Sequence, residues 1–252
     1  MLIYKFDGSL NGLLCCVFKS FTDKEIPDVL SSDKNTQLSL TDREIKIITV
    51  DGQCERIAKA IEKYSGLGGL YDIRYAFKSG AKNKDKIIFD YLKKTFESRC
   101  DISGNFSESS VLAFYDLIKG VSNEVHRMKG FVRFIQTEEG IYYAHIKPDN
   151  DIIALLMPHF SARFNNMQFA IHDEKRNIIG LYNGSERKVI KLNNPLVVKN
   201  GKNEEEFKFL WRTYYESVNI KERENRKLMR RFLPARYEIN LFEKSFKNKE
   251  CI

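Results

Sequence analysis

The first 77 residues follow a strand–helix–strand–helix pattern. An apolar run at residues 1–7 predicts a strand, and after the Asp7-Gly8-Ser9 turn apolar residues recur every three or four positions, as on one helix face. That face comprises Leu10, Leu13, Leu14, Val17, Phe18 and Phe21, and Ser9 is suited to cap the helix. A second apolar run at 45–50 leads into another helix pattern at 51–64. This order predicts a small parallel sheet packed against helices.

Glycines at positions 66, 68 and 69 interrupt this pattern. The stretch 78–86 is rich in Lys, Ser, Gly and Asn, which is typical of a linker or an exposed loop. We therefore predict an N-terminal α/β unit at 1–77 and an α+β domain at 85–252. The latter opens with two amphipathic helices, the first capped by Asp85 and the second beginning at Ser107 with Glu108.

From Gly130 onward the period of the apolar positions changes to two, which is typical of strands. Strands are predicted at 131–137, 141–147, 168–172, 178–182 and 188–192. A helix is predicted from Ile152, and Pro158 should kink or end it because proline has no N–H to donate. The middle third thus predicts a mainly antiparallel sheet with one crossing helix.

The last third has the pattern of helices. Asn203 precedes three glutamates, a typical cap with an acidic first turn, and a stripe of apolar residues follows. We expect this stripe to face the core: Phe207, Leu210, Trp211, Tyr214, Tyr215 and Val218. A second helical segment at 221–232 ends before Pro234. The fold class predicted for the whole chain is α+β.

Charge and hydropathy narrow the classes of partner. Lysine and arginine outnumber aspartate and glutamate by 42 to 34, a formal charge of +8, which favours polyanions. No apolar run approaches the roughly 20 residues of a membrane-spanning helix, and the start lacks the order of a secretory signal. We expect a cytoplasmic protein with no membrane partner.

The five cysteines and four histidines stand at no spacing typical of a metal site. A structural disulfide is not expected from an odd number of scattered cysteines. The sequence predicts neither a metal nor a cofactor.

The densest cluster of charge lies at residues 221–236. It contains seven basic residues: Lys221, Arg223, Arg226, Lys227, Arg230, Arg231 and Arg236. In a helix, Leu228, Met229 and Phe232 face the core while the basic side chains point away from it, as phosphate contacts require. A solvated basic face is an equally open alternative.

A second basic group, Arg127, Lys129 and Arg133, alternates with aromatic residues at 126–134. Such a mixture suits contact with a nucleic-acid backbone together with base stacking. In the alternative, Phe131 and Phe134 take opposite faces of a strand, one of them buried, and the cations complement the dipole of the preceding helix.

Four residues are candidates for catalysis: Asp7, His126, His159 and Arg163. His159 and Arg163 flank Ser161, which offers a nucleophile and a base, although a turn accounts for the same residues. Asp7 suits a general base at the end of a strand, or equally an Asx turn. No phosphate loop or dinucleotide-binding fingerprint is present.

Four stretches of the chain resemble a bacterial family of DNA metabolism and DNA repair proteins of undefined biochemistry. They are YKFDGSLNGLL at 4–14, VHRMKGF at 125–131, residues 145–163, and WRTYYESVNIKEREN at 211–225 with its continuation to Tyr237. In that family the gene stands beside one for a radical SAM protein that modifies or repairs DNA, and a related domain is fused to a uracil-DNA glycosylase-like domain. The resemblance implies a radical SAM partner, since this chain lacks the CxxxCxxC cluster motif itself.

Three hypotheses follow. The first is an accessory protein that binds DNA in repair or base modification and presents it to a radical SAM enzyme. The second is a nucleic-acid-processing enzyme, for base excision or end processing, whose site is assembled from residues distant in sequence. The third is a scaffold that binds an acidic face of a protein partner and does not contact DNA.

Overall fold

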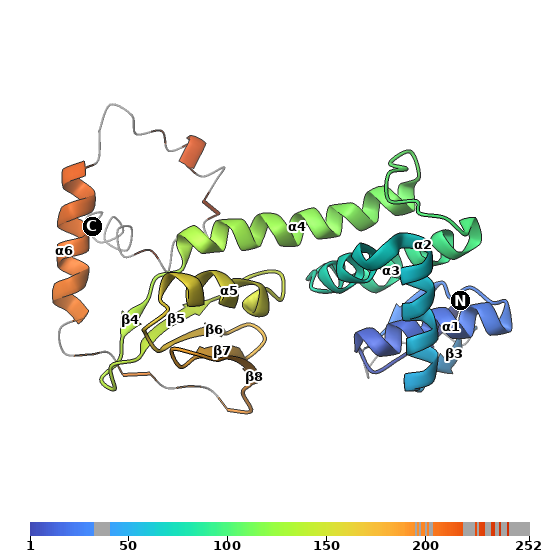
Figure 1. The fold of residues 1–252 in the computed structure, drawn as a ribbon, viewed down its shortest axis with the longest axis horizontal. Coiled ribbons are helices and arrows are strands. Elements are labelled where there is room, and N and C mark those ends of the chain that lie inside the picture. Colours follow the sequence, from blue (N-terminus) through green and yellow to red (C-terminus); the bar gives the residue numbers. More distant parts are fainter. Residues whose placement is uncertain are drawn as a thin grey trace. The chain divides into compact units, whose positions relative to one another are not determined.

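A computed structural model describes residues 1–32, 41–194, 196, 198–199, 201, 204–218, 225, 227–229, 233–234, 237 and 241, with the side chains of 212, 215 and 216 left out. The fold is α+β, as predicted (Figure 1). Contacts divide the chain into two compact units, Met1–Ser122 (unit 1) and Asn123–Ile252 (unit 2). Among the described residues, no helix has both the length and the apolarity to cross a membrane.

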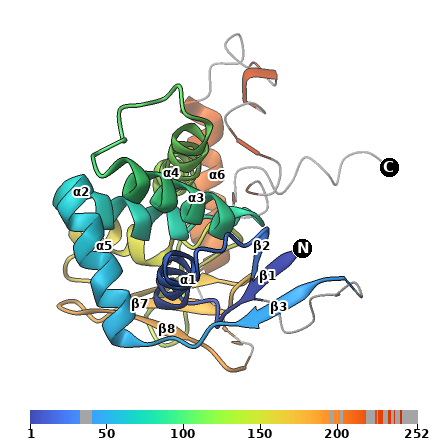
Figure 2. The ribbon, with the colours of Figure 1, turned by 90° about the vertical axis from the view of Figure 1, so that its right-hand side faces the viewer.

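Unit 1 contains the predicted parallel sheet. Strand β1 (Leu2–Lys5) lies between β2 (Val29–Ser31) and β3 (Arg43–Lys46), and Ile3 pairs with Val29 on one side and Glu44 on the other (Figure 2). Helix α1 (Leu10–Asp23) follows β1, and the Ser9 hydroxyl accepts a hydrogen bond from the Gly12 N–H at 2.9 Å. The predicted cap is therefore confirmed, whereas β2 is an additional strand that the apolar pattern did not indicate.

Three further helices complete unit 1. Helix α2 (Asp51–Phe77) continues past the glycines expected to end it, with an interruption at Gly66, whose φ is 68° and ψ −176°. It is followed by α3 (Lys84–Ser98) and by α4 (Ser109–Phe131). The N-cap position of α3 is Asn83, without a side-chain cap hydrogen bond, and the predicted cap Asp85 lies in the first turn. The single core of unit 1 draws buried side chains from β1, α1, α2, α3 and the first half of α4.

The expected linker at 78–86 is a short turn between α2 and the first turn of α3, inside unit 1. Helix α3 and the first half of α4 share their core with the N-terminal sheet because Ile88, Phe89 and Phe114 are completely buried in it. The contacts thus divide the chain at Ser122, away from the predicted 77/85 boundary. That boundary concerns independently folding domains and stays a prediction.

Unit 2 contains a mainly antiparallel sheet, as predicted, in the order β4-β5-β6-β7-β8. Its strands are β4 (Ile135–Gln136), β5 (Tyr142–Ile146), β6 (Phe169–Asp173), β7 (Ile178–Tyr182) and β8 (Arg187–Lys191). Only β5 and β6 are parallel, and the crossing helix α5 (Ile153–Arg163) connects them, because parallel strands need a crossover. The prediction of a strand from 131 was wrong at its start, since α4 continues to Phe131.

Helix α5 lies across one face of this sheet (Figure 1). A Cβ at Gly180 on β7 would lie 2.5 Å from the Met157 sulfur, so this glycine allows the helix to pack directly on the strand. The helix does not end at Pro158 but continues to Arg163. It does so without the hydrogen bond that residue 158 would otherwise donate to the carbonyl of Ala154.

Helix α6 (Glu204–Val218) follows the sheet and stands beside β4 (Figure 1). The chain before it joins the edge of β4, where the Gly201 N–H donates to the Gln136 carbonyl at 2.8 Å. The prediction that its apolar stripe faces the core was wrong for the described side chains. Phe207, Leu210, Trp211, Tyr214 and Val218 are all exposed, and Tyr215 lies outside the described side chains.

Candidate functional site

A cavity of about 680 Å³ lies in unit 2, within the range of about 300–1,000 Å³ typical of ligand sites. Its walls come from the end of α4, the end of α5, strands β4 to β6 and the start of α6. Four basic side chains line it: Lys129, Arg133, Arg163 and Lys208. Seven aromatic side chains share the walls: Phe134, Tyr142, Phe160, Phe164, Phe169, Phe207 and Trp211. The site is thus aromatic and basic together.

One wall is a cluster of phenylalanines around Phe134. Its ring meets those of Phe160, Phe164 and Phe169 edge-on, with centroids 5.3, 5.4 and 5.6 Å apart. Phe160 and Phe164 are one turn apart on α5, and their rings are parallel. Edge-to-face packing holds these rings in fixed orientations, so the wall is preorganised rather than adaptable.

The first half of α6 forms another wall. The helix is anchored by Glu204, whose Oε2 accepts a hydrogen bond from the Gln136 N–H of β4 at 2.9 Å. Trp211 lies two turns further along, and the Arg133 guanidinium lies 5.8 Å from its ring centroid. The anchoring of Glu204 therefore sets where Phe207 and Trp211 stand along the cavity.

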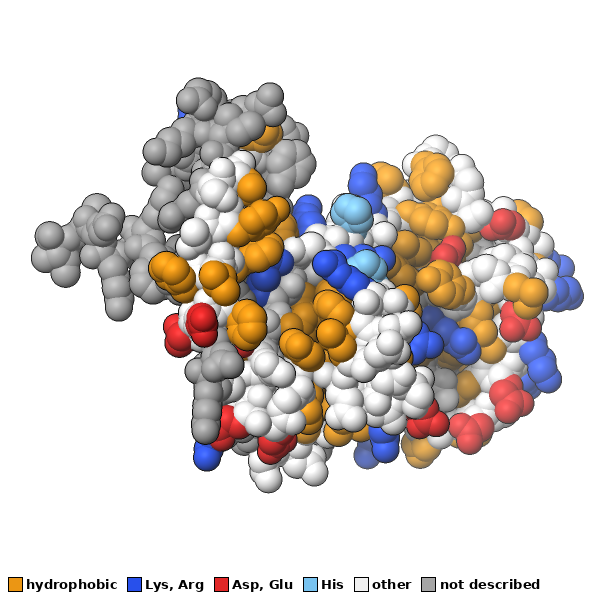
Figure 3. Space-filling model, turned by 60° about the vertical axis from the view of Figure 1, so that its left-hand side comes forward, with side chains coloured by type: hydrophobic (Ala, Val, Ile, Leu, Met, Phe, Trp, Pro, Cys, Tyr) orange, Lys and Arg blue, Asp and Glu red, His pale blue; other side chains and the backbone are white. Residues whose placement is uncertain are grey.

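Lys129 and Arg163 line this cavity, and His159 lies close enough for both of their charges to act on it. Desolvation, followed by the positive charges of Lys129 and Arg163, lowers the pKa of His159 below its ordinary value. Within the described part of the chain, neither Lys129 nor Arg163 forms an ion pair with a carboxylate. On the face drawn in Figure 3, apolar side chains lie directly beside Lys, Arg and His side chains. This excess of positive charge is suited to an anionic group of a ligand.

Arg133 contacts the backbone at the end of α4. Its Nη1 donates to the Gly130 carbonyl at 2.7 Å and to the Val132 carbonyl at 3.3 Å, at the C-terminal end of α4. These carbonyls lack helical partners, so a cation there is favourable. These contacts agree with the alternative in which cations complement the helix dipole, and a phosphate contact of Arg133 stays a prediction.

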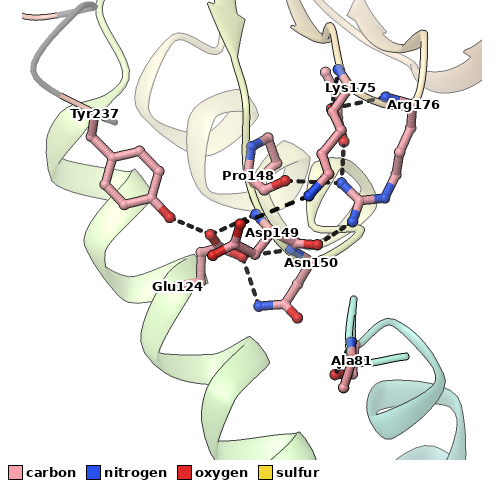
Figure 4. A network of polar contacts seen from close by, with 10 residues as sticks. Ala81, Glu124, Pro148, Asp149, Asn150, Lys175, Arg176 and Tyr237 are labelled. Carbon is pink, nitrogen blue, oxygen red and sulfur yellow. Dashed lines mark hydrogen bonds and ion pairs between the residues drawn. The ribbon is translucent and has the colours of Figure 1, made fainter. Parts of the chain in front are cut away.

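A buried carboxylate holds the second half of α4 in place (Figure 4). Glu124 accepts hydrogen bonds from the backbone N–H groups of Asp149 and Asn150 at 2.9 and 2.8 Å, from the Asn150 side chain, and from the Tyr237 hydroxyl. From the other side, Arg176 donates to the Pro148 carbonyl at 3.1 Å and to that of Asp149. The loop 148–150 is thus fixed between α4 and the β6–β7 turn, and the segment that carries Lys129 is fixed with it.

The remaining predicted nucleic-acid contacts lie elsewhere or outside the described residues. Arg127 is half-buried on α4 and does not line the cavity, and Lys227 is exposed. Nothing is described for Lys221, Arg223, Arg226, Arg230, Arg231 and Arg236. Of the predicted basic residues, the structure brings Lys129, Arg133 and Arg163 together.

The four candidates for catalysis do not share one cavity. Asp7 belongs to unit 1 and makes the Asx turn, because its Oδ1 accepts from the Ser9 N–H at 2.9 Å and from the Ser9 hydroxyl at 2.6 Å, while Thr49 donates to Oδ2. The Ser9 hydrogen bond lowers the Asp7 pKa, which keeps the carboxylate ionised and a weak base. In unit 2, Arg163 lines the cavity, whereas His126 and His159 do not.

Several wall residues were not singled out by the sequence. Phe160 and Phe164 stand one turn apart on α5, a spacing that indicates a shared face, but Phe134 and Phe169 join them only through the sheet. Trp211 was assigned to the core, and Glu204 to a helix cap. Within the described residues, no three His, Cys, Asp or Glu side chains gather as metal ligands.

Comparison with protein families gives one match. The model of a domain of unknown function, DUF4130, matches residues 82–243, a range that includes every residue of the cavity. Neither the curated proteins nor the solved structures gave a match.

Proposed function

We propose that this chain, which belongs to the DUF4130 family of domains of unknown function, binds nucleic acid through the cavity of unit 2. The observation that carries the proposal is the lining of the cavity, which contains both basic and aromatic side chains. Proteins that bind single strands combine cations along the backbone with aromatic rings on which bases stack.

In this proposal the roles are divided among the walls. Lys129 and Arg163, which have no carboxylate partner among the described residues, contact phosphates, and Trp211 and the phenylalanine wall contact bases. A nucleotide also matches the cavity in polarity, because its flat faces are apolar and its phosphate is anionic. The net charge of +8 supports the same class of partner at longer range.

The biological context that we propose is DNA repair or base modification in the cytoplasm. The chain would bind DNA as an accessory protein for a radical SAM enzyme, as the resemblance in its sequence implies. The basic residues at 221–236 would extend the contact with the backbone beyond the cavity.

The direct test replaces Lys129 and Arg163 with Gln and measures binding of a fluorescent single-stranded DNA at several salt concentrations. Each phosphate contact contributes about 0.7 to the slope of log K against log salt on single strands, so the double variant should flatten that slope by about 1.4. Affinity at low salt should fall in parallel. Thermal melts check that the fold is unchanged.

A matched control is Lys59→Gln/Arg74→Gln, which removes the same charge from two exposed positions on α2 of unit 1. We expect it to leave the slope within error of the wild-type protein. If both double variants bind alike, the cavity is not the phosphate-binding site, and if wild-type protein binds no DNA at all, the proposed function is wrong.

The exposed face of α6 favours a second candidate, a scaffold for a protein partner. Phe209, Leu210 and Val218 are more than half exposed and do not line the cavity. Large exposed apolar side chains gathered on one helix are typical of a protein interface. Binding of the radical SAM partner that is lost on Leu210→Glu, with DNA binding retained, would support this function.

A further inference from the structure

One charged group in the cavity has the wrong sign for a phosphate. Glu204 is only 6% exposed, lines the cavity, and uses Oε2 to accept the Gln136 N–H at 2.9 Å. A carboxylate has two oxygens and can accept more hydrogen bonds than this one. A ligand in the cavity that supplies a further donor would stabilise the charge of this mostly buried group.

The chemistry of the carboxylate restricts what the ligand can present. An ionised carboxylate only accepts hydrogen bonds, so it favours an amino group and disfavours a carbonyl oxygen. Among the bases, cytosine presents an exocyclic amino group at the position where uracil and thymine present a carbonyl, and Glu is a typical acceptor for the cytosine amino group.

The surrounding walls restrict the ligand further. Trp211 and Phe207 on α6 line the same cavity as the phenylalanine wall, so a ligand there can contact aromatic rings from both elements. A base inside a duplex has both faces covered by its neighbours and its pairing edge occupied. Only a base that is unpaired and unstacked from its neighbours exposes the faces and the edge at once.

We propose that the cavity accepts one unpaired base bearing an exocyclic amino group, and that Glu204 is the residue that reads this group. The inference rests on the proposed function and adds to it a strand requirement and a base preference. The nearby cations, Lys129 and Arg163, would then hold the phosphates that flank the base.

The test compares oligo(dC) with oligo(dU) of equal length, because the two bases differ mainly in the groups on their pairing edge. Wild-type protein should bind oligo(dC) roughly tenfold more tightly, the size expected for one good base contact. In Glu204→Gln the side-chain oxygen can still accept the Gln136 N–H, while its amide donates. The variant should therefore lose the preference or reverse it toward oligo(dU).

The control is Glu206→Gln, the same change at an exposed position on α6 that does not line the cavity. It should keep the wild-type preference, and the melting temperatures of both variants should match that of the wild-type protein. A blunt duplex of the same length should bind more weakly than either single strand.

The outcomes separate this inference from the proposed function. The proposed base preference is wrong if oligo(dC) and oligo(dU) bind equally and Glu204→Gln does not change their binding. If the Lys129 and Arg163 variant still weakens binding in that case, the proposed binding of single strands is retained. Equal or tighter binding of duplex overturns the strand requirement. If dCMP binds as tightly as oligo(dC), the cavity holds a free nucleotide, and if no oligonucleotide binds, both proposals are wrong.

Discussion

Helices α1 and α6 carry nearly the same apolar pattern and end up in opposite environments. On α1, Leu13 and Val17 are completely buried in the core of unit 1. On α6, the corresponding stripe is exposed, with Trp211 at 40% and Leu210 at 54% of their full surface. Both helices would be drawn alike on a helical wheel.

The difference shows what an apolar stripe does and does not determine. Its period fixes which side of the helix avoids water, but the element that covers that side is decided by the rest of the fold. Helix α1 is covered by α2 and α3, whereas α6 is anchored at its start, through Glu204 and the edge of β4. An exposed apolar stripe is then available for a ligand or a partner.

The largest expected effect is on stability and separates the two helices. Leu13→Ala should lower the free energy of unfolding by about 2–5 kcal/mol, because it removes a completely buried side chain and leaves a cavity. The matched change on the exposed helix, Leu210→Ala, should alter it by less than about 0.5 kcal/mol. Urea titrations of the two variants measure both values, and similar losses would mean that the α6 stripe is packed after all.

The next effect is on binding and concerns the exposed helix alone. Trp211→Ala should weaken binding of single-stranded DNA by about 1–3 kcal/mol, the range for loss of one base–aromatic stack, while the melting temperature stays nearly constant. Trp211 is the single tryptophan of the chain, so its fluorescence in the wild-type protein should also change on titration with DNA. Unaltered fluorescence at saturating DNA would place the strand away from this wall.

The smallest effect is a dependence of binding on pH. The pKa of His159 is lowered, so the free protein holds this side chain neutral at neutral pH, and a phosphate beside it favours the protonated form. Affinity should rise as pH falls from about 8 to about 5.5, across the ordinary histidine pKa near 6.5, and His159→Gln should reduce this rise.

Folding stability should move the other way for the same residue. Because the folded pKa lies below the unfolded one, the unfolded chain binds the proton first. The contribution of neutral His159 to the free energy of unfolding is therefore fully present above about pH 6.5, and it is lost as pH falls through and below that value. Melting curves of wild type and His159→Gln across the same range test this sign, and parallel curves would contradict it.

Much of the architecture could be predicted because local pattern determined it. The strands β6, β7 and β8 and the helix between β5 and β6 stand close to their predicted positions. The start of β4 was wrong because Gly130 suggested the end of a helix, but Met128 and Val132 are buried and α4 continues to Phe131. The three-residue β2 is formed by pairing with β1, and such a long-range contact cannot be predicted from a local pattern.

The candidate site could be predicted only in its charges. Lys129 and Arg133 were selected because cations beside aromatics are visible in the sequence, Arg163 was selected only as a candidate for catalysis, and all three line the cavity. The aromatic wall combines Phe134, the pair Phe160 and Phe164, and Phe169. These three segments meet only in the folded chain, so no spacing along the sequence could predict the wall. Trp211 is exposed because its side of α6 is not fully covered by another element. That too is a property of the fold and could not be predicted from local pattern.

The buried carboxylate of Glu124 has a consequence for the order of events during biosynthesis. The core of unit 1 is complete once residue 117 has been made, and domains generally fold as the chain emerges from its N-terminus. Glu124 is synthesised immediately afterwards, but the hydroxyl that donates to its Oε1 belongs to Tyr237, 113 residues later. Before Tyr237 is made, Asp149 and Asn150 can already donate to the carboxylate, and water takes the place of the missing hydroxyl. We expect the region around Glu124 to close fully only when Tyr237 has been translated.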